Sequence, residues 1–539
     1  MTATFFSRLL AVEMNSADEG MHDRHFRTDH LLPNLKHRTV SSGFVTGISQ
    51  ASQFALMLGS TMVLARLLSP RDFGLVAMVW TVMGFLRVFK EAGLSTATVQ
   101  REGITHAQVS NLFWVNLAVS GCITLLVAGA APAIARFYKE PRLVGVTLFL
   151  SVSFFLTGVA VQHLALLNRQ MRFKAIAVIQ VGSTLSGIIV GITMAGLQCS
   201  YWSLVGMNLT TSFMALVMTW SVSGWRPQRF RRHSGTRSLV HFGTHLTAGT
   251  FFYSLARGLD GLLIGRFSGA PAVGLYNRAS TLLNRPLEQA IAPVEAVFIP
   301  ALSRIQGDEE RYQRAFLQIY ETIVLSGSLL TGTCLGLAHP ITRVVLGPKW
   351  GGAAIIFASF TLAALQYFPT TFATWLFFTQ GRGKGALAAA SIMAVLVAGS
   401  FIAGVPYGPA GVAMSYSLSC LLLQMPILFW LAGRSGPVTT SDLWKGFLKY
   451  LPVWAIVCLV TWSVRIPIPD DQPLTELLIA GTCGILAGIA CISVYPPARR
   501  LVMALLSLLA EMASAPRFAA WLPSRFRSLI FKMGSVKRD

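Results

Sequence analysis

The chain has 539 residues, of which 53% are hydrophobic and only 12% are charged. Soluble domains carry about 25% charged residues, so the composition excludes a string of soluble domains and indicates a chain that folds in a lipid bilayer. The surplus of 44 Lys and Arg over 22 Asp and Glu raises nucleic acid as a partner. No basic domain with interleaved aromatic residues and no zinc-finger spacing supports that partner.

Residues 1–41 are polar and of mixed charge, and the apolar opening "FFSRLLAV" is too short for a secretory signal. We expect this segment to be a cytoplasmic tail. Seven cysteines are scattered through apolar segments without a C-x-x-C pair, so neither a disulfide framework nor a metal site is predicted.

Apolar runs near 20 residues recur along the rest of the chain, and each is long enough to cross a ~30 Å hydrocarbon core as a helix. Charged, glycine and proline boundaries separate them. They predict fourteen spans, near residues 43–65, 73–93, 110–135, 143–167, 174–197, 201–223, 239–265, 274–302, 317–340, 352–378, 385–405, 409–432, 447–465 and 474–495.

The basic residues alternate between the two sides of these spans. With a cytoplasmic N-terminus, 32 Lys and Arg fall on the cytoplasmic side and 8 on the opposite side, and the remaining 4 lie in or at the edges of spans 7 and 8. Cytoplasmic loops retain positive charge, so this bias predicts that both termini are cytoplasmic and explains the high net charge.

Two stretches of the chain repeat at an offset of 200 residues. "LARLLSPRDFGLVA" at 64–77 and "LIGRFSGAPAVGLY" at 263–276 align Arg66 with Arg266 and Gly74 with Gly274. A weaker repeat places Arg172 over Arg382. Six spans separate the copies, which predicts two halves of equal orientation related by an axis along the membrane normal.

The expected fold is therefore an all-α polytopic membrane protein with two six-helix lobes and two extra helices. The first expected parts are the tail (1–41), an N-lobe (42–224) and a basic cytoplasmic linker (225–238). They are followed by a C-lobe (239–432), spans 13–14 (433–495) and a basic amphipathic cytoplasmic tail (496–539). Tails of that last composition bind the headgroup layer.

Spans 7 and 8 carry an unusual set of charges for apolar segments: Arg257, Asp260, Arg278, Arg285 and Glu288. A charge near the bilayer centre costs about 2.5–3.5 kcal/mol, so these side chains are expected to face protein or water. One interpretation is salt bridges that fix helix packing. The other is a hydrated cavity that binds an anionic head group, for which arginine suits phosphate.

A second cluster lies at the predicted cytoplasmic end of span 2, where Arg87, Lys90 and Glu91 mark either a positive inner boundary or the mouth of a cavity. Gln50 and Gln53 in span 1 favour the bundle interior, as cavity lining or as partners in interhelical hydrogen bonds. No catalytic residues and no nucleotide-hydrolysing domain are predicted, because every soluble segment is short.

Four ordered segments resemble one family. They are "ARLLSPRDFGLVAM" (65–78), "ALLNRQMRFKAIA" (165–177), "LDGLLIGRFSGAPAVGLYNRASTLLNRP" (259–286) and "PVEAVFIPALSRIQGD" (293–308). They are similar to the polysaccharide transporter family, in its Wzx-type and colanic-acid-exporter-like branch, within the superfamily of multidrug, oligosaccharidyl-lipid and polysaccharide exporters. The similarity runs over roughly residues 41–465.

The resemblance implies a V-shaped bundle that flips an undecaprenyl-pyrophosphate-linked oligosaccharide outward by alternating access. It also implies a central cavity lined by spans 1, 2, 7 and 8, in which Arg257, Arg278 and Arg285 face the pyrophosphate. Asp260 and Glu288 partly neutralise these arginines.

We therefore expect a multi-pass flippase of the cytoplasmic (inner) membrane for an O-antigen, exopolysaccharide or capsule repeat unit. Its expected partners are the lipid-linked oligosaccharide, the lipid bilayer and a polysaccharide polymerase or export machinery. No cofactor is predicted, and coupling to an H⁺ gradient, an Na⁺ gradient or the membrane potential is left open. The alternative is an ion-coupled exporter of small molecules on the same fold, which predicts a cavity dominated by unpaired acids.

Overall fold

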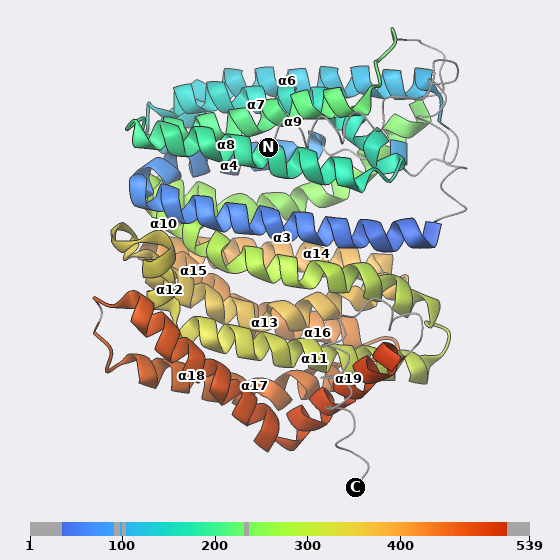
Figure 1. The fold of residues 1–539 in the computed structure, drawn as a ribbon, viewed down its shortest axis with the longest axis vertical. Coiled ribbons are helices and arrows are strands. Elements are labelled where there is room, and N and C mark those ends of the chain that lie inside the picture. The colour runs from blue at the N-terminus through green and yellow to red at the C-terminus, as the bar shows by residue number, and fades with distance from the viewer. Residues whose placement is uncertain (1–34, 91–97, 100–103, 231–236, 470, 515–539) are drawn as a thin grey trace. The chain divides into compact units, whose positions relative to one another are not determined.

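The computed structural model describes residues 35–90, 98–99, 104–230, 237–469 and 471–514. Within these ranges every regular element is a helix (Figure 1). The chain divides into two compact units, one of residues 1–67 and 82–251 and the other of residues 68–81 and 252–539. The fold is thus all-α, as the composition predicts.

The first unit packs helices whose ends are set by local sequence. Thr105 and Gln108 form a capping box at the start of α6, where the Thr105 hydroxyl accepts from the Gln108 N–H. At its other end Lys139 takes a left-handed conformation with φ 56°. The elements of this unit are α3 (Leu35–Leu67), the second half of α4 (Pro70–Lys90), α6 (His106–Tyr138), α7 (Leu143–Arg169), α8 (Phe173–Gly196) and α9 (Trp202–Ser223).

Aromatic side chains form the core at one end of the first unit. The buried His163 ring stacks on Trp220 at 4.4 Å between centroids and meets Trp225 edge-on at 4.9 Å. Next to it, the buried Gln162 side chain donates to the Thr98 hydroxyl at 2.8 Å. These contacts tie α7 to α9 and to residues 98–99.

The second unit is built around α13, most of whose apolar stretch is buried inside the protein. Its other elements are the first half of α4, α10 (Arg237–Arg304) from residue 252 on, α11 (Glu309–Gly336), α12 (Ala338–Leu346), η2 (Pro348–Trp350), α13 (Ala353–Thr379), α14 (Gly383–Gly404), η3 (Val405–Tyr407), α15 (Gly408–Ser419), η4 (Cys420–Gln424), α16 (Met425–Gly433), α17 (Thr440–Arg465), α18 (Pro473–Val494) and α19 (Pro496–Ser514).

The helix α10 joins predicted spans 7 and 8 and is interrupted at Gly269. This glycine has φ 80° and ψ 179°, a conformation that a side chain disfavours. Beyond the interruption, α10 lies against the start of α4: a Cβ on Gly274 would sit 1.9 Å from the Pro70 carbonyl oxygen, and one on Gly74 would sit 1.7 Å from that of Ala270. The two glycines that the repeat aligns therefore meet at one backbone contact.

The weaker repeat is also visible in the structure, once in each unit. Arg172 precedes α8 with φ −80° and ψ 55°, and Arg382 precedes α14 with φ −84° and ψ 56°. Arg172 donates to the Val222 carbonyl at 3.2 Å, and Arg382 donates to those of Ala432 and Ser435 at 2.7 Å each. Each arginine thus ties the start of one helix to the end of a later helix in its unit.

We expect Arg382→Ala to lower the free energy of unfolding by about 1.5–3 kcal/mol, because two hydrogen bonds from a charged donor are lost. Thermal unfolding of the purified protein in detergent measures this. Lys384→Ala, two residues away and without such contacts among the described residues, is the matched control. Equal stability of the two variants would show that the hydrogen bonds of Arg382 do not stabilise the protein.

Nine helices of the described residues are long and apolar enough to cross a membrane, or ten if the bent pair α11–α12 counts as one span. Predicted spans 11 and 12 fall within a single apolar stretch, Gly383–Gly433. Helices α4 and α10 are not among these nine. The protein is a multi-pass membrane protein, and the number fourteen stays a prediction.

Candidate functional site

A cavity of about 410 Å³ lies inside the second unit, among α10, α13, α14, α15, η4 and α16. The α14 wall contributes Ala386, Ala389 and Ala390, whose short side chains leave the space open. The α10 and α13 walls supply most of the polar groups. The cavity therefore combines polar and apolar surface within a bundle of apolar helices.

Two charged residues of α10 line this cavity, and both were singled out by sequence. Arg257 is exposed, and its charge acts on the carboxylate of Asp260 three residues later. The Asp260 Oδ1 accepts from the Gly261 N–H at 2.6 Å. The Tyr276 hydroxyl faces the same carboxylate without reaching hydrogen-bond geometry. The carboxylate thus keeps free acceptor capacity toward the cavity.

The α13 wall carries a row of hydroxyls. Thr370, Thr371 and Thr374 each donate their hydroxyl hydrogen to a carbonyl four residues earlier, at 2.7–2.9 Å. The lone pairs of these oxygens therefore remain as acceptors, because a hydroxyl has one donor and two acceptor sites. Such a row suits a cation or a ligand with N–H or O–H groups.

A stretch of π-helix also reaches the cavity wall. The segment η4 widens the turn between α15 and α16, and π-helical turns occur frequently at functional sites. It places Gln424 at the cavity, where its side-chain amide donates to Ser419 at 3.2 Å. This local distortion contributes one more polar group to the cavity.

Aromatic rings complete the lining. Tyr276 meets Phe360 at 5.1 Å, Phe360 meets Tyr416 at 6.3 Å, and Tyr416 stacks on Phe401 at 5.3 Å. Such rings offer apolar faces edged by hydroxyls, which suit amphipathic ligands.

The other charged residues of α10 lie outside this cavity. Arg278 places its guanidinium 4.4 Å above the centroid of the Phe73 ring, and its Nε has no hydrogen-bond partner. Arg285 and Glu288 pair with each other at 3.4 Å, with 59% and 44% of their side chains exposed. The structure therefore joins Arg257 with Asp260 and separates them from the Arg285–Glu288 pair.

We expect Arg285→Glu to change stability by less than about 1 kcal/mol, because exposed ion pairs contribute little. The charge-swapped double variant Arg285→Glu with Glu288→Arg restores the pair and is expected to match the wild type. Thermal unfolding of the purified variants is the measurement. A much larger loss for Arg285→Glu would contradict the exposed position of the pair.

The residues predicted in spans 1 and 2 have separate positions. Gln50 is exposed on α3, and Gln53 donates to Gln180 of α8 at 3.1 Å, an interhelical hydrogen bond. Arg87 and Lys90 end α4, where the structure describes the backbone and not the side chains, and Glu91 lies outside the described residues.

Sequence reasoning missed the polar residues of α13, α15 and η4. The signal was present as "QYFPTTFAT" at 366–374, where a glutamine and three threonines interrupt an apolar span. Threonine is nearly neutral in hydropathy, so charge counting passed over it. In the described part of the chain no three His, Cys, Asp or Glu side chains group into a metal site.

An all-helical bundle with many membrane spans and a cavity that holds charged and hydroxyl side chains is typical of a membrane transporter rather than a soluble binding protein. The family model described as "Polysaccharide biosynthesis protein" matches residues 63–355, more than half of the chain. The chain belongs to this family.

Curated relatives agree with that assignment. The succinoglycan biosynthesis transport protein ExoT of Rhizobium meliloti is 26% identical over 66% of this chain and 72% of its own length. The lipopolysaccharide biosynthesis protein WzxC of Escherichia coli is 23% identical over 59% of this chain and 65% of its own length. The chain is thus similar to a transport protein of succinoglycan biosynthesis and to a protein of lipopolysaccharide biosynthesis.

One solved structure shows the same fold. The lipid II flippase MurJ, in an inward closed conformation, superposes with a TM-score of 0.67 over 84% of this chain and 99% of its own. The sequences are 15% identical, so this similarity concerns the fold.

Proposed function

We propose that the protein is a flippase that moves an undecaprenyl-pyrophosphate-linked oligosaccharide across the cytoplasmic membrane by alternating access. The observation that carries the proposal is family membership over residues 63–355, together with a relative named as a transport protein of succinoglycan biosynthesis. A fold similar to that of a lipid II flippase supports it. The bias of basic residues supports cytoplasmic termini.

The membrane potential favours outward movement of this cargo. A diphosphate with about two negative charges gains roughly 2.3 kcal/mol per charge per 100 mV on leaving a negative interior, or about 5 kcal/mol in total. Direct coupling to an ion gradient is a further part of the proposal, and we assign it to Asp260. Among the described residues that line the cavity, Asp260 supplies the one carboxylate, and the threonine oxygens of α13 face the same space. A carboxylate with hydroxyl acceptors takes up H⁺ or Na⁺.

Deletion of the gene, followed by analysis of lipid-linked sugars, tests the function. We expect undecaprenyl-pyrophosphate oligosaccharide to accumulate on the inner leaflet while surface glycan disappears. Unchanged glycolipids with altered drug tolerance would instead favour an ion-coupled small-molecule exporter. Complementation with the intact chain is the control.

A further inference from the structure

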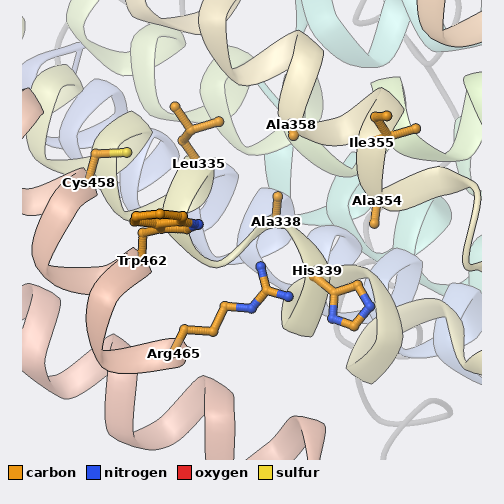
Figure 2. A pocket seen from close by; sticks show the side chains of 10 residues that line it. Leu335, Ala338, His339, Ala354, Ile355, Ala358, Cys458, Trp462 and Arg465 are labelled. Atoms are coloured by element: carbon orange, nitrogen blue, oxygen red, sulfur yellow. The ribbon is translucent and has the colours of Figure 1, made fainter. Parts of the chain in front are cut away.

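A second hollow, of about 490 Å³, lies in the second unit where α11 and α17 end and α13 begins (Figure 2). It shares no lining residue with the candidate cavity. The basic loops of this unit, at 304–314 and 382–384, lie at the opposite ends of these helices. By the distribution of basic residues, the hollow therefore lies at the predicted outer side of the membrane.

Small residues and a bend in the chain create the hollow. Helix α12 departs from α11 at 74°, so the polypeptide turns away beyond Gly336. Ala338, Ala354 and Ala358 line the space that remains. At its rim, Ile355 is 62% exposed and Trp462 is 52% exposed. Exposed apolar side chains on membrane-spanning helices contact lipid, so the hollow opens on the bilayer.

Arg465 supplies the polar wall. Its Nε pairs with Glu476 of α18, whose side chain is fully buried. Figure 2 shows the terminal nitrogens of the guanidinium directed toward Ala338 and His339. No described residue accepts a hydrogen bond from them, and the buried Nδ1 of His339 has no partner either. The terminal nitrogens of Arg465 and the Nδ1 of His339 thus lack hydrogen-bond partners among the described residues. This is unfavourable at an apolar hollow unless a ligand or water forms hydrogen bonds with them.

We propose that this hollow binds one phospholipid of the surrounding bilayer. The phosphate accepts from the terminal nitrogens of Arg465, whose planar fork matches a phosphate with two parallel hydrogen bonds. An acyl chain lies against Ile355, Ala358 and Trp462, and tryptophan favours this headgroup depth. Glu476 balances the charge of Arg465, so the site takes the phosphate without requiring an acidic head group.

The bilayer, rather than the proposed cargo, is the source of this lipid. The hollow is open on its lipid-facing rim, and none of its residues borders the cavity that contains Arg257 and Asp260. The bound lipid would hold α11, α13 and α17 together at this end. The inference therefore does not depend on which substrate the protein transports.

Native mass spectrometry of the full chain, purified in mild detergent with bacterial polar lipids, tests the proposal. Ala358→Phe fills the hollow, and the double variant Arg465→Gln with Glu476→Gln removes the phosphate ligand without leaving a buried charge unpaired. We expect each to retain one phospholipid fewer than the wild type. Each should also lose at least half of the rise in unfolding temperature that added phospholipid produces.

The control is Arg434→Gln, at the other end of the helices, where the arginine lies 5.0 Å from the Trp430 ring. This variant should keep the lipid complement of the wild type. Equal lipid retention by all four proteins would overturn the proposal, as would recovery of a polyprenyl phosphate instead of a phospholipid from the wild type. Loss or retention of surface glycan in the deletion strain tests the proposed function. Lipid retention by the purified variants tests this site, so the two results are independent.

Discussion

Alanine at Gly274 is expected to destabilise the protein by about 1–3 kcal/mol or more, because the added methyl group overlaps backbone atoms that no rotamer change moves away. Its Cβ would lie 1.9 Å from the Pro70 carbonyl oxygen and 3.1 Å from the Gly74 nitrogen. Gly74→Ala has the same effect through the Ala270 carbonyl oxygen at 1.7 Å. The start of α4 and the second part of α10 must separate to accept either methyl group. Thermal unfolding and gel filtration of the purified variants measure the loss.

Gly84→Ala on α4 is the matched control, because a Cβ there meets nothing within 4 Å. Alanine exceeds glycine in helix propensity by up to about 1 kcal/mol, so this change is neutral or stabilising. Two double variants compare the sites further. In Gly74→Ala with Gly274→Ala, the changes in the free energy of unfolding should not add, because both methyl groups enter one contact. In Gly74→Ala with Gly84→Ala, the two changes should add. If Gly274→Ala is as stable as Gly84→Ala, the two helices do not approach as closely as described.

The helical fold was predictable because hydropathy and charge are properties of short segments. The repeats at offsets of 200 and 210 residues also aligned Gly74 with Gly274 and Arg172 with Arg382. An alignment of two copies within a chain shows, however, which residues correspond, and not whether they are in contact in the folded protein. That Gly74 and Gly274 touch, or that Arg172 and Arg382 each donate to a carbonyl about 50 residues later, depends on how helices pack.

The candidate site was predictable only in its charged half. Arg257 and Asp260 stand out because a charge in an apolar span is unfavourable unless it has a partner or a function. The α13 hydroxyls carry no such signal, because each bonds to its own helix backbone. Nothing in the sequence indicates that Arg278 lies over the ring of Phe73, which belongs to a helix some 200 residues earlier. The separation of Arg278 and Arg285 from the cavity is therefore a result of tertiary structure.

Asp260→Asn is expected to reduce glycan export at least tenfold while leaving the protein folded. The amide has nearly the shape of the carboxylate and still accepts from the Gly261 N–H, so packing is kept. It carries no negative charge and does not exchange a proton, so the proposed coupling at this site is lost. A tenfold change corresponds to about 1.4 kcal/mol in the rate-limiting barrier. Surface glycan per unit of membrane-inserted protein is the measurement.

Three further variants test whether the Asp260 carboxylate couples export to an ion gradient or only forms part of the cavity wall. Asp260→Glu keeps the charge and is expected to retain part of the export activity. Thr371→Val removes one acceptor from the same cavity and should weaken export less than Asp260→Asn, because neighbouring hydroxyls remain. Arg257→Gln removes the neighbouring positive charge and keeps the carboxylate, so its export separates the role of the arginine from that of the carboxylate. Full export by Asp260→Asn would show that the carboxylate is not the coupling group.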